Sequence, residues 1–406
     1  MKYQTHILPN GIRLIHLEVN NPVAHLGLIV NTGSRDELEH QHGMAHLIEH
    51  LVFKGTKKRK AYHILSRMED VGGEINAYTT KEETSIYTIF FPQYYERSLE
   101  LISDLIFNST FPEKEITREK EVVIDEINSY KDSPYELIYD EFEELIFRGN
   151  PIGRSILGEE DTLKALTRDE ILAFYNDHYQ TDHMVISSVG NIKFNRLVKY
   201  AKKYFSDHPL KTRQSVRFPV NGYTKEFKTI QKDTYQAHCV MGNRAYPVKD
   251  DKRMALYLLN NLLGGPGLNS RLNLSLREKN GYAYNLDSSY TSYSDTGIIS
   301  IYFGTDQKDI DKCIKLVLRE LNDLKNKQLG TSQLQKAKRQ LLGQIAISAE
   351  NNESLMLTLG KSYYLFDKVD SLEETAAKID SITSLQLLET ANEIFDEANI
   401  SYLIYR

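Results

Sequence analysis

The sequence predicts an α+β protein of two tandem duplicated domains, each a mostly antiparallel β-sheet packed against helices. Two observations lead to this prediction. Short apolar runs rich in β-branched residues alternate with helical patterns along the chain, and the order of elements in the first half returns in the second. With 406 residues, of which 41% are hydrophobic, the chain can fill two cores without disulfide bonds.

The elements of the first half follow from local signals. Pro9-Asn10-Gly11 between two apolar runs predicts a β-hairpin, because Asn-Gly suits a tight turn. The run AHLGLIVNT (24–32) predicts a strand, and the largely apolar run from Met44 to Phe53 predicts a buried helix that ends near Gly55. The other predicted elements are a helix at 61–71, strands at 74–80 and 84–91, helices at 93–108, 113–130, 134–148 and 168–179, a strand at 183–189 and a helix at 194–205.

Three pairs of segments indicate a duplication. They are 24–30 with 237–243, 84–92 with 296–304, and 167–187 with 383–403. Matching elements in one order at nearly constant offsets are typical of a tandem repeat. A stretch rich in proline and basic residues, without apolar periodicity, separates the halves. The predicted boundaries are 1–210 for the N-terminal domain, 211–222 for the linker and 223–406 for the C-terminal domain.

Composition excludes several classes of function. The chain has 50 Lys+Arg against 56 Asp+Glu, a net charge of −6, so it lacks the basic excess expected of a nucleic-acid-binding protein. No apolar run reaches the length of a membrane span, and neither nucleic acid nor membrane is an expected partner. The two cysteines, Cys239 and Cys313, favour a reducing, cytoplasmic location. Any metal would therefore be held by histidines and carboxylates.

The informative motif is His46-Leu47-Ile48-Glu49-His50. Positions i, i+3 and i+4 share one helix face, so two imidazoles and a carboxylate converge. Two histidines at this spacing suit zinc, and Glu49 could accept a proton from water; this H-x-x-E-H pattern is the inverzincin arrangement. The bare pattern also occurs by chance on solvated helices. The apolar neighbours favour a buried site, whose polar groups need a partner such as a metal ion. His40 and His42 are interpreted as loop residues.

The motif and its surroundings resemble a known family. HGMAHLIEHLVFKGT (42–56) followed by MEDVGGEINAYTTKEETSIYTIF (68–90) is similar to the zinc peptidases that include pitrilysin, insulin-degrading enzyme and the mitochondrial processing peptidase, in particular their small single-chain bacterial members. The resemblance extends over essentially the whole chain. It implies a processing-peptidase-like half-clamshell of two related domains.

The resemblance implies a complete metal site. His46 and His50 would bind zinc with a third ligand from a downstream helix, Glu126, while Glu49 acts as general base. Glu119 lies seven residues before Glu126, which is two helical turns, and would orient a histidine. Asp125 is the rival third ligand, and Glu121 is interpreted as part of a solvated face. The second copy has Leu256, Leu259, Asn260 and Gln344 at the matching positions, so one zinc ion per chain is expected.

The resemblance also implies residues that hold substrate. Arg277 and Tyr284 form the family's R-x6-Y pair, with Arg271 and Tyr282 as rivals on composition alone. A phosphate-binding loop at the glycine-rich segment 264–267 is less favoured, because no G-K-[ST] ending follows it. An extended peptide is expected to pair with Asn76 and Ala77 of the strand 74–80 by β-augmentation.

The predicted function is that of a zinc metalloendopeptidase that hydrolyses unfolded peptides or presequences. The resemblance implies a homodimer in which the partner chain completes each active site with its Arg277 and Tyr284. The sequence leaves two other classes of function open. One is a catalytically silent scaffold or partner subunit of a peptidase complex, and the other is a peptide-binding module that uses zinc structurally.

Overall fold

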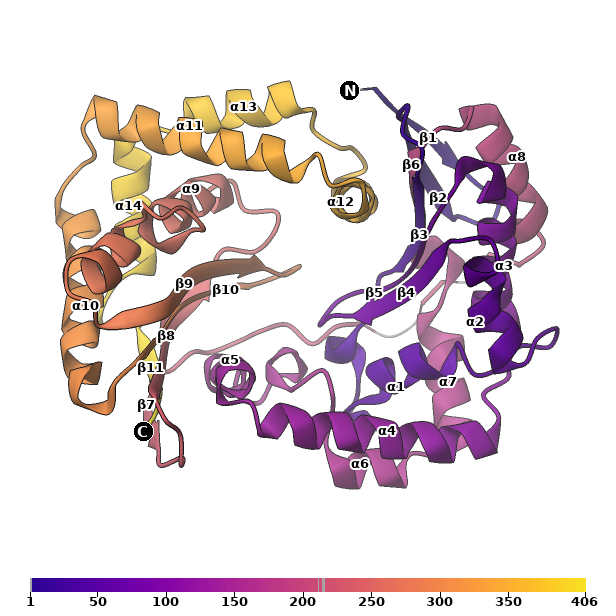
Figure 1. Cartoon of the computed structure of the whole chain (residues 1–406), viewed down its shortest axis with the longest axis horizontal. Helices are drawn as coiled ribbons and strands as arrows, with labels where there is room; N and C mark the ends of the chain where they lie inside the picture. The colour runs from indigo at the N-terminus through magenta and orange to yellow at the C-terminus, as the bar shows by residue number, and fades with distance from the viewer. Residues whose placement is uncertain (1, 211, 214–215) are drawn as a thin grey trace. The chain divides into compact units, whose positions relative to one another are not determined.

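The computed structural model describes residues 2–210, 212–213 and 216–406 (Figure 1). They form two compact units, neither of which is continuous in sequence. The first unit contains the described residues of Met1–Asn128, Arg154–Arg217 and Ala346–Leu372, and the second contains Ser129–Gly153, Phe218–Ile345 and Glu373–Arg406. Each unit is a mostly antiparallel sheet with helices on both faces, which confirms the predicted fold class.

The first unit contains a six-stranded sheet in the order β1-β2-β6-β3-β5-β4. Its strands are β1 (Tyr3–Ile7), β2 (Arg13–Glu18), β3 (Ala24–Val30), β4 (Glu74–Thr79), β5 (Thr84–Phe90) and β6 (Met184–Gly190). The predicted hairpin is present: β1 pairs with β2, and Gly11 adopts a φ of 87° in the turn. Only the pair of β2 with β6 is parallel among these strands, and β4 ends the sheet.

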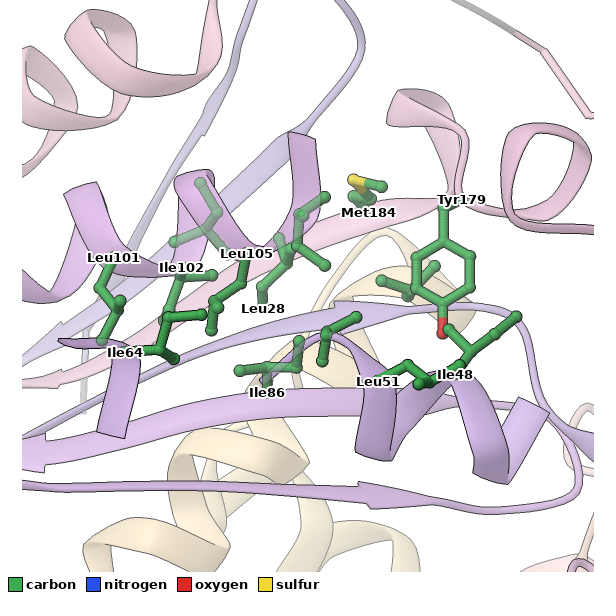
Figure 2. Packing of buried hydrophobic residues seen from close by; sticks show 14 of the residues in the cluster. Leu28, Ile48, Leu51, Ile64, Ile86, Leu101, Ile102, Leu105, Tyr179 and Met184 are labelled. Atoms are coloured by element: carbon green, nitrogen blue, oxygen red, sulfur yellow. The ribbon is translucent and has the colours of Figure 1, made fainter. Parts of the chain in front are cut away.

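Helices lie on both faces of this sheet. The helices of the first unit are α1 (Met44–Leu51), α2 (Ala61–Glu69), α3 (Tyr95–Asn108), α4 (Glu113–Lys131), α6 (Glu160–Ala165), α7 (Arg168–His178), α8 (Phe194–Phe205) and α12 (Asn352–Phe366). Helices α3 and α8 lie on one face and α12 on the other (Figure 1). In the main core, Ile48 and Leu51 of α1 point toward Tyr179 and the strands (Figure 2). The short helix α6 has no counterpart in the sequence prediction.

The second unit repeats this plan with a five-stranded sheet in the order β7-β11-β8-β10-β9. Its elements are α5 (Pro134–Ile146), β7 (Phe227–Ile230), β8 (Ala237–Ala245), α9 (Arg253–Gly264), β9 (Ala283–Ser292), β10 (Gly297–Thr305), α10 (Ile310–Asn326), α11 (Thr331–Ser348), α13 (Leu372–Ser381), α14 (Ser384–Ile394) and β11 (Ser401–Tyr405).

Several features of the two units correspond. The parallel pair β7–β11 matches β2–β6, and the order of the next three strands is the same in both sheets. Helices α7 and α14 begin with the same capping box, built by Thr167 with Glu170 and by Thr383 with Gln386. These likenesses support the duplication that the sequence offsets indicate.

Each half of the sequence gives one helix to the unit formed mainly by the other half. Ile138 and Phe142 of α5 pack in a cluster with residues of β8 and β11 in the second unit. Met356 and Leu359 of α12 pack in a cluster with residues of β2 and β6 in the first unit. The compact units therefore differ from the predicted 1–210 and 223–406, which describe the two sequence copies. The exchange buries apolar helix faces that local periodicity cannot assign to a particular sheet.

Part of the predicted linker 211–222 lies outside the described residues, namely 211 and 214–215. Within the described part, Arg213 and Arg217 form ion pairs with the buried Asp36 at 2.7 and 2.8 Å. Burial raises the pKa of Asp36, but the two arginines outweigh it and leave this pKa below its ordinary value. This end of the linker is thus anchored to the first unit. In the part of the chain that the structure describes, none of the helices has the length and apolar character of a membrane span.

Candidate metal centre

Helix α1 carries the H-x-x-E-H motif and is fixed by its apolar face. Gly43 precedes the helix with a φ of 95°, a conformation that favours glycine. Met44, Leu47, Ile48 and Leu51 are fully buried. Because these residues face the core, the remaining positions 46, 49 and 50 lie on the side of the helix toward α4 and β4.

His46, His50 and Glu126 come together on that side. Glu126 Oε2 lies 3.9 Å from Nε2 of His46 and 3.8 Å from Nε2 of His50. One ligand atom from each residue lies within 4.8 Å of the others. Among residues 2–210, 212–213 and 216–406, no other group of three His, Cys, Asp or Glu side chains offers such a cluster. Asp125, the rival ligand in the sequence prediction, is exposed and lies outside this cluster.

The three residues fit a zinc ion. Zinc prefers four ligands at about 2.0 to 2.2 Å in a tetrahedron, which puts nitrogen and oxygen ligands roughly 3.3 to 3.5 Å apart. Glu126 Oε2 lies 3.8 and 3.9 Å from the two histidine nitrogens, and all three ligand atoms lie within 4.8 Å of one another, so the group must close somewhat around the ion. Burial, followed by the neighbouring His50, lowers the pKa of His46 to about 4, so its imidazole is neutral at pH 7, as a metal ligand must be. Three protein ligands leave the fourth position for water or substrate.

Glu119 holds the ring of His50. Its Oε2 lies 3.2 Å from Nδ1 of His50, and its Oε1 lies 2.8 Å from Nζ of Lys54. The carboxylate of Glu119 is almost fully buried, and it turns the opposite ring nitrogen toward Glu126. Glu119 is thus placed where the predicted orienting role requires it, and its partner Lys54 is not among the predicted site residues. The segment FKGT (53–56), which carries Lys54, is a possible signal for it, because it follows the motif directly.

Glu49 lies beside this group without being part of it. Burial raises its pKa above the ordinary value, Thr79 of β4 and His50 oppose the shift, and Glu126 adds to it. Its Oε2 is buried and has no hydrogen-bond partner among the described residues. A buried carboxyl with one unpaired oxygen next to a metal-ligand group is suited to exchange a proton with water. Thr79 is not among the predicted site residues.

Asn76 and Ala77 lie on β4, the edge strand next to α1. Their neighbours across the sheet are Tyr87 and Ile86 of β5. The side chains of these two residues point to opposite faces of the sheet. That of Asn76 is exposed, and that of Ala77 packs against the core. In the part of the chain that the structure describes, no strand pairs with the outer side of β4. That side offers backbone groups to an extended peptide.

The predicted substrate-binding residues Arg277 and Tyr284 belong to the second unit, whereas His46 belongs to the first. Arg277 lies in the last turn of a short π-helix, Asn273–Glu278, and its side chain is half exposed, while Tyr284 of β9 is 70% exposed. Both rivals are engaged within that unit. Arg271 lies 3.7 Å from Glu320, and Lys312 lies over the ring of Tyr282.

The second unit has apolar and amide residues where the first has the motif. Leu256 and Leu259 of α9 are buried in its core. Asn260 donates to the carbonyl of Ser288 on β9 at 2.9 Å. The matching helix thus binds the neighbouring strand directly, in place of a ligand group.

Comparisons with known proteins match two family profiles to successive parts of the chain. The profile of the insulinase family, peptidase family M16, matches residues 14–160, and that of the peptidase M16 inactive domain matches 165–341. An uncharacterized zinc protease of Bacillus subtilis is 32% identical over 96% of this chain and 94% of its own length. An uncharacterized zinc protease of Rickettsia felis is 31% identical over 98% of this chain and 96% of its own length. The beta subunit of the mitochondrial-processing peptidase of Caenorhabditis elegans is 27% identical over 97% and 87%.

Solved structures share the fold. A protease from Helicobacter pylori superposes with a TM-score of 0.93 at 22% identity, covering 100% of this chain and 99% of the other. A peptidase M16 inactive domain from Pseudomonas fluorescens superposes with a TM-score of 0.92 at 20% identity, covering 100% and 98%. At these identities the likeness concerns the fold alone.

Proposed function

Because this chain belongs to the insulinase family of peptidases, peptidase family M16, we propose that it is a zinc endopeptidase that cleaves unfolded peptides or presequences. The relatives named zinc proteases support a metalloprotease at the level of the family. The observation that carries the proposal for this chain is the cluster of His46, His50 and Glu126 with the buried Glu49 beside it.

In the proposed site, His46, His50 and Glu126 would hold one zinc ion per chain. When bound, zinc lowers the pKa of a water molecule to about 7 and polarises the scissile carbonyl. Glu49 accepts a proton from water at its unpaired Oε2 and donates it to the leaving nitrogen. The raised pKa of Glu49 favours the second of these steps, because it brings the acid form closer to neutral pH.

The substrate would add a strand to the free edge of β4 at Asn76 and Ala77. Main-chain pairing selects extended, unfolded segments more than particular side chains, which supports unfolded peptides as the substrate class. Arg277 would donate to a substrate carbonyl, and the hydroxyl of Tyr284 would stabilise the oxyanion. The exposure of both side chains within their unit supports this assignment over Arg271 and Tyr282.

The assembly proposed is a homodimer in which each chain supplies Arg277 and Tyr284 to its partner's site. Glu49→Gln and Arg277→Ala chains should each have low activity, and mixing them should restore activity, because one mixed site then has both groups intact. A mixture no more active than either parent would exclude this exchange.

Metal analysis and peptide cleavage test the proposed function together. The wild type should bind zinc and cleave an unfolded peptide, whereas Glu49→Gln should bind zinc without cleaving. Zinc binding without cleavage of any of several peptides by the wild type would instead favour a catalytically silent subunit or a peptide-binding module.

A further inference from the structure

The five-residue segment Gly33–Glu37 contacts both the end of the edge strand β4 and the first turn of α1, the helix with the H-x-x-E-H motif. At its start it binds the turn between β4 and β5: Ser34 N donates to Thr80 O at 3.1 Å, and Arg35 N donates to Lys81 O at 2.8 Å. The approach is so close that a Cβ on Gly33 would overlap the carbonyl oxygen of Thr80. The segment is therefore fixed to the end of β4.

At its other end, Glu37 binds the first turn of α1. Its Oε2 accepts from Gly43 N at 3.0 Å, and its Oε1 accepts from Ala45 N at 2.7 Å. The first N–H groups of a helix have no partners within the helix, and a side chain at the N-cap position commonly accepts from one of them. In α1 that position is Gly43, which has no side chain. Glu37 supplies the missing acceptor from six residues away.

A gain in stability alone does not explain why a carboxyl group is buried at position 37. Glu37 is 1% exposed, and burial raises its pKa to about 8, although the N–H groups of Ala45 and Gly43 and the charge of Arg154 oppose the shift. Desolvation thus outweighs the contacts that Glu37 makes. Buried ionisable groups whose environment disfavours the charged form are concentrated at functional sites.

We propose that Glu37 is a positioning residue that fixes the first turn of α1, and with it His46, at a set place relative to the edge of β4. His46 directly follows Ala45, whose N–H is bound by Glu37, so an error in this turn moves a ligand nitrogen. This role rests on the proposed function and deepens it. Segment 33–37 then holds the metal-ligand group and the peptide-binding edge of β4 in a fixed position relative to one another.

The test compares Glu37→Gln and Glu37→Asp with the control Glu39→Gln, which changes an exposed carboxylate two residues further on. Glutamine keeps the shape of the side chain, but its amide nitrogen cannot accept from a backbone N–H as either oxygen of a carboxyl group can. Aspartate is too short to keep both bonds. The readouts are zinc affinity by competition with a chelator, the visible spectrum of the Co²⁺-substituted protein, the unfolding temperature, and kcat and KM for an unfolded peptide.

We expect Glu37→Gln to unfold at a temperature equal to or above that of the wild type at pH 7.5. Its zinc affinity should fall roughly tenfold, its Co²⁺ spectrum should shift, and its kcat should fall about tenfold at unchanged KM, since groups outside the ligand set typically contribute about 10- to 100-fold. The zinc affinity and kcat of Glu37→Asp should lie between those of Glu37→Gln and the wild type. Glu39→Gln should have wild-type zinc affinity, Co²⁺ spectrum and kcat.

Wild-type zinc affinity and an unchanged Co²⁺ spectrum in Glu37→Gln would overturn the proposal. If Glu37→Gln does not fold, the same two measurements on Glu37→Asp decide, and wild-type values there would overturn it as well. If the wild type binds zinc but cleaves no peptide, the proposed function fails, while the affinity and the spectrum still test the role of Glu37.

Discussion

The carboxylate of Glu119 lies 3.2 Å from Nδ1 of His50, on the ring edge opposite the nitrogen that faces Glu126. A carboxylate in this place fixes the tautomer and the orientation of a metal-binding imidazole. Because Glu119 and Glu126 lie two turns apart on α4, one helix presents both the group that orients His50 and the third member of the cluster.

Replacement of Glu119 should weaken the site without removing a ligand. In Glu119→Gln the amide no longer attracts the ring N–H as a carboxylate does and loses its ion pair with Lys54. Zinc affinity, measured by competition with a chelator, should fall by roughly 10- to 100-fold. Glu121→Gln is the matched control, because Glu121 is exposed on the same helix. Equal affinities of the two variants would contradict the orienting role.

Glu49 and Glu126 should respond differently to the same substitution. Glu49→Gln should retain zinc and lose about 10²- to 10⁴-fold in kcat, the typical contribution of a general base. Glu126→Gln should lose both zinc and activity, because it removes a ligand. Zinc content and peptide cleavage are measured on both variants. A Glu49→Gln protein without zinc would place Glu49 among the ligands instead.

The close packing of α12 on the first sheet should be sensitive to one methyl group. A Cβ at Gly360 would overlap Ile29 and come within 2.9 Å of Ser187 Cβ. Gly360→Ala should lower the free energy of unfolding by about 1 to 3 kcal/mol, measured by denaturant unfolding. Gly343 of α11 is the control, since nothing lies within 4 Å of its Cβ position, and alanine there should stabilise by about 0.4 to 1 kcal/mol. The opposite ranking of the two variants would refute this packing argument.

The pH dependence of stability should carry the signature of Glu37. Burial raises its pKa from the ordinary 4.5 to about 8 in the folded state. Between these values the folded chain holds a proton that the unfolded chain has lost. Its free energy of unfolding therefore falls as pH rises through this window, by at most about 1.4 kcal/mol per pH unit, with no contribution to the slope below or above it.

Urea unfolding of zinc-free wild type and Glu37→Gln at pH 5, 6, 7 and 8 isolates this contribution. Glutamine does not titrate, so the wild type should lose stability relative to the variant as pH rises. Parallel curves for the two proteins would show that Glu37 keeps its ordinary pKa.

Much of the fold could be predicted because its signals are local. The Asn-Gly hairpin, the strand at 24–32 and the helix with the motif all depend on neighbours within a few residues. The sheet on which the predicted helix 134–148 packs could not be predicted in this way, and helix α12 (Asn352–Phe366) is not among the predicted elements. Only the packed structure shows that α5 belongs to the second unit and α12 to the first.

The sequence by itself determined that His46, Glu49 and His50 share a helix face, because helix geometry fixes the spacing of residues three and four apart. It also indicated the duplication and the absence of the motif from the second copy. Only the tertiary structure decided that Glu126 rather than Asp125 reaches the histidines, that Lys54 pairs with Glu119, and that Glu37 binds the start of α1. These contacts join separate elements across loops, and their distances depend on how the whole core packs.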